Sequence, residues 1–187
     1  MPWIRHSSRV VFENDWMVVR EDDVTNPGGG QNRYGHVQFK NVAVAILPVD
    51  ADGNTYLVGQ SRYTLDAYSW ELPMGGAPLD EDPLDAARRE LQEETGLLAH
   101  EWVELMRLHL SNSITDELGV VYLARDLVPG DARHEETEDI TVRVLPVAEA
   151  VELALSGEIT DALSVAALQR YALMQTSLGS AGKNARA

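Results

Sequence analysis

Three glutamates close together in a predicted helix are the residues best suited to chemistry. Glu93 and Glu94 follow Glu90 by three and four residues, and an α-helix turns by about 100° per residue, so the three carboxylates share one face. Clustered carboxylates suit a hard divalent cation such as Mg²⁺, which takes oxygen ligands and shares them with substrate phosphates. The spacing therefore favours a metal site that binds a phosphorylated substrate and positions water for attack on phosphorus.

The sequence around these glutamates predicts a well-bounded helix. Asp82 suits the N-cap, Pro83 the first helical position and Gly96 the position just after the last turn. Arg89 stands one turn before Glu93 and offsets part of the repulsion between the carboxylates. A solvated acidic helix is the alternative interpretation, and it must also explain the glycine-rich turn, the cap and the arginine.

The segment that contains this helix resembles the Nudix box. The match covers every defined position: Gly75, five residues, Glu81, seven residues, and then Arg89-Glu90-Leu91-Gln92-Glu93-Glu94-Thr95-Gly96-Leu97. The resemblance implies an α/β fold, the Nudix fold, built as a mixed-sheet α/β/α sandwich. It also implies hydrolysis of a nucleoside diphosphate linked to another group, with Mg²⁺ as cofactor and Mn²⁺ as a possible substitute.

The resemblance implies a role for each residue of the box. The three glutamates are the expected metal ligands, Glu93 is also counted as catalytic, and the backbone carbonyl of Met74 is a further ligand. Gly75, Glu81 and Arg89 are expected to support the loop and the helix.

The flanking sequence is similar to the branch of the family that cleaves ADP-ribose and nucleotide sugars. Residues 60–63, QSRY, and 70–73, WELP, resemble the lead into the box in that branch. Arg62 is expected to contact a substrate phosphate, because a guanidinium matches phosphate oxygens. Glu71 is expected to hold a ribose hydroxyl or Arg62 itself, and an ordinary surface ion pair is an equal alternative for either residue.

Two later segments also resemble this branch. Residues 111–117 lie where it has a substrate-side loop that ends in a glutamate, here Glu117. The region lacks the proline that marks many ADP-ribose enzymes, which favours a nucleotide sugar or broad specificity. Residues 134–140, HEETEDI, resemble the loop that supplies the general base, with Glu138 as first choice and Glu136 as second. An ordinary acidic loop is the alternative there.

The chain divides into three parts by its patterns. Residues 1–40 predict a small antiparallel β subdomain, residues 41–176 the Nudix domain, and residues 177–187 a mobile tail. Residues 42–48 and 56–60, separated by the turn at 50–54, predict a hairpin at the start of the Nudix domain. The N-terminal strands fit the homodimers of this branch, in which they contribute to the partner's cleft. Trp16 and Tyr34 could stack on a base there, and buried packing in the dimer interface is the alternative for both.

The amino-acid composition limits the kinds of partner that the protein is expected to bind. The 187 residues include 30 acidic and 15 basic side chains, with a formal net charge of −15, and no cysteine. An acidic chain disfavours nucleic acid and anionic membranes as partners, because both need Lys and Arg. The absence of cysteine excludes disulfides and thiolate metal sites, and with the lack of a signal peptide or an apolar span it predicts a cytoplasmic protein.

The carboxylate cluster and the resemblance to this Nudix branch together imply a Mg²⁺-dependent pyrophosphohydrolase. Its substrate would be a small molecule, ADP-ribose or a nucleotide sugar, cleaved to a nucleoside monophosphate and a sugar phosphate. Two alternatives stay open. One is a Nudix hydrolase of nucleoside triphosphates or dinucleoside polyphosphates, and the other is a sensor that binds ADP-ribose or a nucleotide sugar without turnover.

Overall fold

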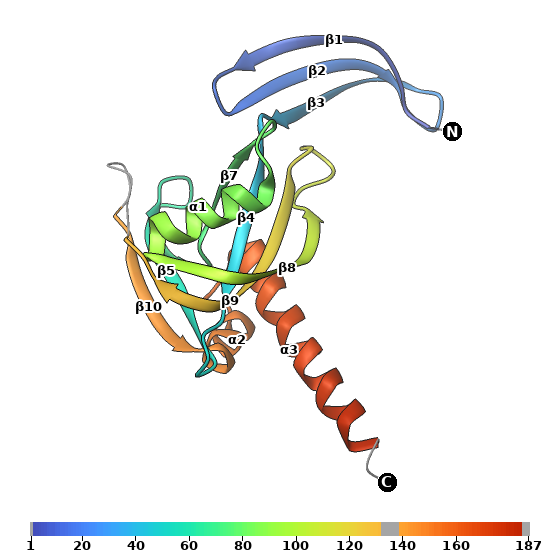
Figure 1. Cartoon of the computed structure of the whole chain (residues 1–187). Helices are drawn as coiled ribbons and strands as arrows, with labels where there is room; N and C mark the ends of the chain where they lie inside the picture. Colours follow the sequence, from blue (N-terminus) through green and yellow to red (C-terminus); the bar gives the residue numbers. More distant parts are fainter. Residues whose placement is uncertain (1, 132–138, 185–187) are drawn as a thin grey trace.

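The computed structural model describes residues 2–131 and 139–184, with side chains up to residue 177 (Figure 1). Within these ranges the elements follow in the order β1 (Ile4–Glu13), β2 (Met17–Thr25), β3 (Gln31–Phe39), β4 (Asn41–Pro48), β5 (Asn54–Arg62), β6 (Ala67–Glu71), β7 (Met74–Pro78), α1 (Pro83–Thr95), β8 (Leu97–His109), β9 (Leu118–Pro129), β10 (Thr141–Pro146), α2 (Val147–Ser156) and α3 (Ala162–Asn184).

The body of the molecule is built on a mixed sheet with the strand order β7-β4-β9-β8. Strands β4 and β9 run parallel, and the other pairs are antiparallel. On β4, Val44 and Ile46 pack with the buried side of α1, whereas Ala45 and Leu47 pack with α2 and α3 on the opposite face. Helices cover both faces of this sheet, which confirms the mixed α/β fold expected from the sequence.

A second sheet of the body has the order β10-β5-β6, so the predicted hairpin between residues 42–48 and 56–60 is wrong. The turn itself forms, since the backbone N–H of Asp50 donates to the carbonyl of Asn54 at 3.0 Å. The two strands that it joins enter different sheets, however, because β4 pairs with β7 and β9 while β5 pairs with β6 and β10. Residues 44–48 are buried on both sides, as a central strand requires.

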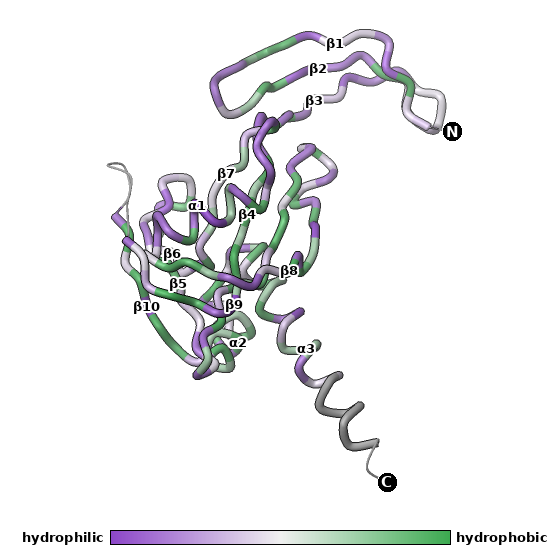
Figure 2. Tube along the Cα trace, in the orientation of Figure 1, coloured by the Kyte–Doolittle hydropathy of each residue, from purple (hydrophilic) through white to green (hydrophobic). Residues whose placement is uncertain are grey.

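The N-terminal strands form a separate antiparallel sheet, β1-β2-β3, that extends away from the body (Figure 1). Its β2–β3 turn is ordered by Asn26, whose Oδ1 accepts from the N–H groups of Gly28 and Gly30. The sheet meets the body where Val37 N donates to Ile114 O at 2.8 Å and Phe39 N donates to Asp116 Oδ1 at 2.8 Å. Hydrophilic residues recur along β1–β3, whereas the strands of the body carry longer hydrophobic stretches (Figure 2).

Helix α1 begins and ends as the sequence predicts. Asp82 has extended backbone angles and accepts from Leu84 N at 2.8 Å, and Gly96 closes the helix with a φ of 69°, a left-handed conformation that favours glycine. Helix α3 continues to Asn184, and so runs into the segment 177–187 that the sequence analysis expects to be a mobile tail. Within the described ranges no helix has the length and apolar character needed to cross a membrane.

Candidate active site

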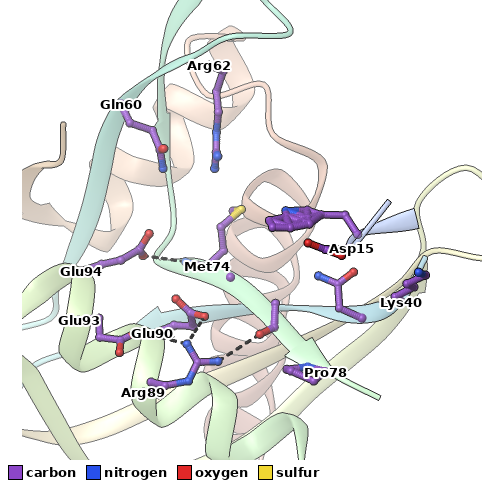
Figure 3. A pocket seen from close by; sticks show the side chains of 14 residues that line it. Asp15, Lys40, Gln60, Arg62, Met74, Pro78, Arg89, Glu90, Glu93 and Glu94 are labelled. Carbon is purple, nitrogen blue, oxygen red and sulfur yellow. Dashed lines mark hydrogen bonds and ion pairs between the residues drawn. The ribbon is translucent and has the colours of Figure 1, made fainter. Parts of the chain in front are cut away.

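A cavity of about 510 Å³ opens between α1, the start of β7, the end of β5 and the turn between β1 and β2. The three glutamates of α1 line one side, and Gln60 and Arg62 point into the cavity from the other (Figure 3). The remaining lining residues are Asp15, Trp16, Lys40, Asn41, Met74, Gly75, Gly76, Pro78 and Arg89. The structure thus brings Met74, Gly75, Arg62 and Trp16 to the carboxylates of α1.

Glycine at position 75 leaves room for the side chain of Glu90. A Cβ atom built on Gly75 would overlap the carboxyl group of Glu90. The side chain of Glu90 is 13% exposed and pairs with Arg89 at 2.7 Å. The backbone of β7 at Gly75 and the Glu90 side chain of α1 are therefore in direct contact, with no room for a side chain at position 75.

Arg89 donates hydrogen bonds to four groups in the box segment. Its Nη1 donates to Glu90 at 2.7 Å and to Glu93 at 3.1 Å, while its Nη2 donates to the carbonyl of Gly76 at 3.1 Å and to Glu81 at 3.3 Å. Burial lowers the pKa of Arg89, but the surrounding carboxylates outweigh burial and raise the pKa above its ordinary value. Arg89 is consequently a permanent cation. Glu81 does not line the cavity but accepts a hydrogen bond from Arg89, which does.

Glu94 fixes the start of β7. It is 2% exposed, and its Oε2 accepts from the backbone N–H of Met74 at 2.9 Å. The carbonyl of Met74 belongs to the same short segment as the glycine under Glu90. The hydrogen bond from Met74 N thus links the carboxylate of Glu94 to the residue whose carbonyl is the further expected metal ligand.

The donor set fits a hard divalent cation. Three carboxylates and a backbone carbonyl supply only oxygen ligands, which Mg²⁺, Mn²⁺ and Ca²⁺ accept. In the described residues the carboxylates are bonded to Arg89 and to backbone, and no three acidic or histidine side chains converge on one point. The close contact between Glu90 and Gly75 keeps these oxygens at the cavity wall.

Arg62, which lines the cavity across from the glutamates of α1, forms a bidentate pair with Glu71. Nε and Nη2 of Arg62 donate to the two carboxylate oxygens of Glu71 at 3.0 and 2.5 Å. The side chain of Glu71 is 5% exposed and that of Arg62 is 35% exposed. The hydrogen bond to Glu71 raises the pKa of Arg62. Among the described residues no hydrogen bond is made by Nη1 of Arg62, whose side chain lines the cavity.

Of the residues that reach the cavity from outside the box, Trp16 was expected at a substrate cleft, that of a partner chain, and it lines the cavity of its own chain, whereas Asp15 and Lys40 were not expected. Asp15 and Trp16 reach the cavity from the β1–β2 turn, which Lys40 holds through Glu13 at 2.8 Å and the carbonyl of Asn14 at 2.7 Å. The pattern of a short polar turn does not reveal such long-range packing. Gln60, two residues before Arg62, could have been found, because alternate residues of a strand face the same side.

Of the predicted site residues that the structure describes, Glu71 and Glu81 do not line the cavity but bond Arg62 and Arg89, which do line the cavity. Glu117 does not line it. Its carboxyl group is half-buried, and burial together with the carboxylate of Asp161 raises its pKa. Glu136 and Glu138, the two candidates for the general base, lie outside the described residues.

Comparison with known proteins agrees with this geometry. Residues 39–168 match the NUDIX domain family, and residues 3–37 match the family described as the nucleoside diphosphate sugar hydrolase N-terminal domain. The chain is 38% identical to an ADP-ribose pyrophosphatase of Mycobacterium tuberculosis, a match that covers 86% of this chain and 78% of that protein. It is 33% identical to an ADP-ribose pyrophosphatase of Bacillus subtilis, over 88% of this chain and 90% of that protein.

A solved structure shares the fold. A crystal structure of an ADP compounds hydrolase superimposes with a TM-score of 0.86 at 22% identity, covering 96% of this chain and 97% of that one. The complete box on α1, the cavity that it lines and the match over residues 39–168 lead to one conclusion. The chain belongs to the Nudix family of hydrolases.

Proposed function

We propose that this enzyme is a Mg²⁺-dependent pyrophosphohydrolase of ADP-ribose or of a nucleotide sugar such as GDP-mannose. The observation that carries the proposal is the placement of the α1 carboxylates and Arg62 on opposite sides of one cavity. The relatives named ADP-ribose pyrophosphatase and the match of residues 3–37 to a nucleoside diphosphate sugar hydrolase N-terminal domain support it. The cytoplasmic location expected from the sequence stays a prediction.

The residues of the cavity divide the work of substrate binding. Glu90, Glu93, Glu94 and the carbonyl of Met74 would hold the cation, which supplies neutralisation of the diphosphate and of the charge that develops during attack. Nη1 of Arg62 would donate to a phosphate oxygen, since Glu71 already fixes the rest of the guanidinium.

The exposed ring of Trp16 gives the cavity an aromatic wall for a base. A substrate role for Glu117 remains part of the proposal, although this residue does not line the cavity.

The reaction is attack of water on one phosphorus of the diphosphate. The bond between that phosphorus and the bridging oxygen breaks, and the bridging oxygen leaves with the other phosphate. A nucleoside monophosphate and a sugar phosphate result. We assign the removal of the water proton to Glu138, or else to Glu136, on the resemblance of residues 134–140 to the base-bearing loop of this branch.

A substrate panel tests the proposal. ADP-ribose, GDP-mannose, UDP-glucose and nucleoside triphosphates are incubated with the protein and Mg²⁺, then with EDTA, and products are separated by ion-exchange chromatography. The account expects metal-dependent release of nucleoside monophosphate from the sugar-linked diphosphates. Preference for triphosphates would move the enzyme to another substrate class, and binding without turnover would make it a sensor.

We also propose a homodimer built through the N-terminal sheet. Ile4, Val10, Val11 and Phe12 on β1 are 47–55% exposed, and β1 is an edge strand. An apolar edge of this kind favours association with another chain. Light scattering after size exclusion should give twice the chain mass of 20.6 kDa, and Val11→Asp with Phe12→Asp should shift it to the monomer. A wild-type monomer at micromolar concentration would contradict the dimer.

A further inference from the structure

Leu72 and Pro73 form the short connection that carries the chain from β6, in one sheet, to β7, in the other. Backbone groups of Leu72, of Pro73 and of Met74, the first residue of β7, are bonded to three different elements. Leu72 N donates to Ser164 Oγ on α3 at 2.9 Å. Pro73 O accepts from Ile46 N on β4 at 2.8 Å, and Met74 N donates to Glu94 Oε2 on α1 at 2.9 Å.

Ser164 is the unexpected member of this set. It lies 92 residues after Leu72, is fully buried, and stands in the first turn of α3. Asp161 fixes that turn, since its Oδ1 accepts from Ser164 N at 2.7 Å and its carbonyl accepts from Val165 N at 2.9 Å. Asp161 therefore acts as the N-cap of α3 and sets the position of the Ser164 hydroxyl.

We infer that Ser164 is a positioning residue for the metal site. By accepting from Leu72 N, it fixes the segment that presents the Met74 carbonyl and pairs Met74 N with Glu94. The inference rests on the proposed role of these groups as metal ligands. It assigns a function to the start of α3.

A hydroxyl at position 164 is needed for this role, whereas an apolar side chain would suffice for packing. Leu72 is fully buried, so loss of the serine oxygen leaves its N–H without an acceptor in a dry environment. The segment then gains freedom to move relative to α1. Removal of a group that orients a metal ligand commonly weakens metal binding by about 10- to 100-fold.

The test measures Mn²⁺ binding to the full chain without substrate, by electron paramagnetic resonance of the free ion. Ser164→Ala should raise the Kd for Mn²⁺ about tenfold, and Ser164→Thr, which retains the hydroxyl, should stay within about threefold of the wild type. Thr55→Val is the matched control. Its hydroxyl is also fully buried, but among the described residues it has no hydrogen-bond partner, so its loss should leave the Kd unchanged.

Asp161 provides a second, milder variant in case Ser164→Ala does not fold. Asp161→Ala removes the cap and should weaken Mn²⁺ binding, whereas Asp161→Asn caps almost as well and should bind as the wild type does. Unchanged Mn²⁺ affinity in folded Ser164→Ala, or equal weakening in Asp161→Asn and Asp161→Ala, would overturn the inference. Failure of the wild type to bind Mn²⁺ or to hydrolyse any substrate would instead overturn the proposed function.

Discussion

The carboxyl group of Glu90 occupies the space into which a Cβ atom at position 75 would project. Gly75→Ala must therefore displace either Glu90 or the start of β7. Because a misplacement of about 1 Å can lower a rate about 100-fold, we expect a fall of that size in kcat/KM. The measurement is steady-state hydrolysis with saturating Mg²⁺.

Gly35→Ala is the control for this substitution, because a Cβ atom there meets nothing within 4 Å and the residue lies on β3, away from the cavity. It should retain wild-type activity. An active Gly75→Ala enzyme would show that the contact between residues 75 and 90 does not define the site.

Substitutions of the neighbouring residues Arg89 and Arg88 are expected to differ in their effect on activity. Arg89→Gln removes the cation that bonds Glu81, Glu90 and Glu93, so we expect kcat to fall about 10- to 100-fold. Arg88→Gln removes only an exposed pair with Asp85 at 2.8 Å, which contributes at most about 1 kcal/mol to stability. Equal activities of the two variants would argue against a role of Arg89 in arranging the carboxylates.

The Arg62–Glu71 pair should matter mainly for substrate binding. Glu71→Gln frees the guanidinium from its fixed position, and we expect KM to rise about tenfold with a smaller change in kcat. Glu104→Gln is the matched control, because Glu104 holds Arg107 in the same bidentate manner, at 2.9 and 2.7 Å, on the exposed surface of β8. A lower kcat with unchanged KM in Glu71→Gln would contradict a binding role for Arg62.

The raised pKa of Glu117 predicts that the stability of the protein depends on pH. Burial and the Asp161 carboxylate raise its pKa above the ordinary value of 4.5. The folded protein therefore binds this proton more tightly than the unfolded chain does, so the contribution to stability is present below about pH 4.5 and is lost as pH rises through the folded pKa.

Glu117→Gln should accordingly raise the melting temperature at pH 7 and leave it nearly unchanged at pH 4. Thermal unfolding at the two pH values measures this difference. A variant that is less stable than the wild type at pH 7 would show that the charged carboxylate has a favourable partner in the folded protein.

The bounds of α1 and the family of its motif were predictable because their determinants are local. The cap at Asp82, the stop at Gly96 and the spacing of the glutamates depend on residues within a few turns of one helix. The structure agrees with the predicted bounds of α1, and the comparisons confirm the family.

Contacts between distant segments were not predictable in the same way. Strands β4 and β5 look like a hairpin in the local sequence, but each pairs with strands that lie far away along the chain. Val44 on β4 pairs with Val120 on β9, and Val58 on β5 pairs with Val142 on β10. Tertiary packing therefore decides the pairing. The approach of Asp15 to the cavity and the bond from Leu72 to Ser164 depend on the same long-range assembly.

Hydrolysis of ADP-ribose by the wild type and by Glu93→Gln, each with Mg²⁺ and with EDTA, tests the central claim most directly. The control is Glu101→Gln, which removes an exposed carboxylate on β8. The account predicts Mg²⁺-dependent release of nucleoside monophosphate by the wild type and the control, and a loss of at least about 100-fold, ~2.7 kcal/mol in transition-state stabilisation, in Glu93→Gln. Activity that survives both EDTA and Glu93→Gln would contradict a metal site on α1.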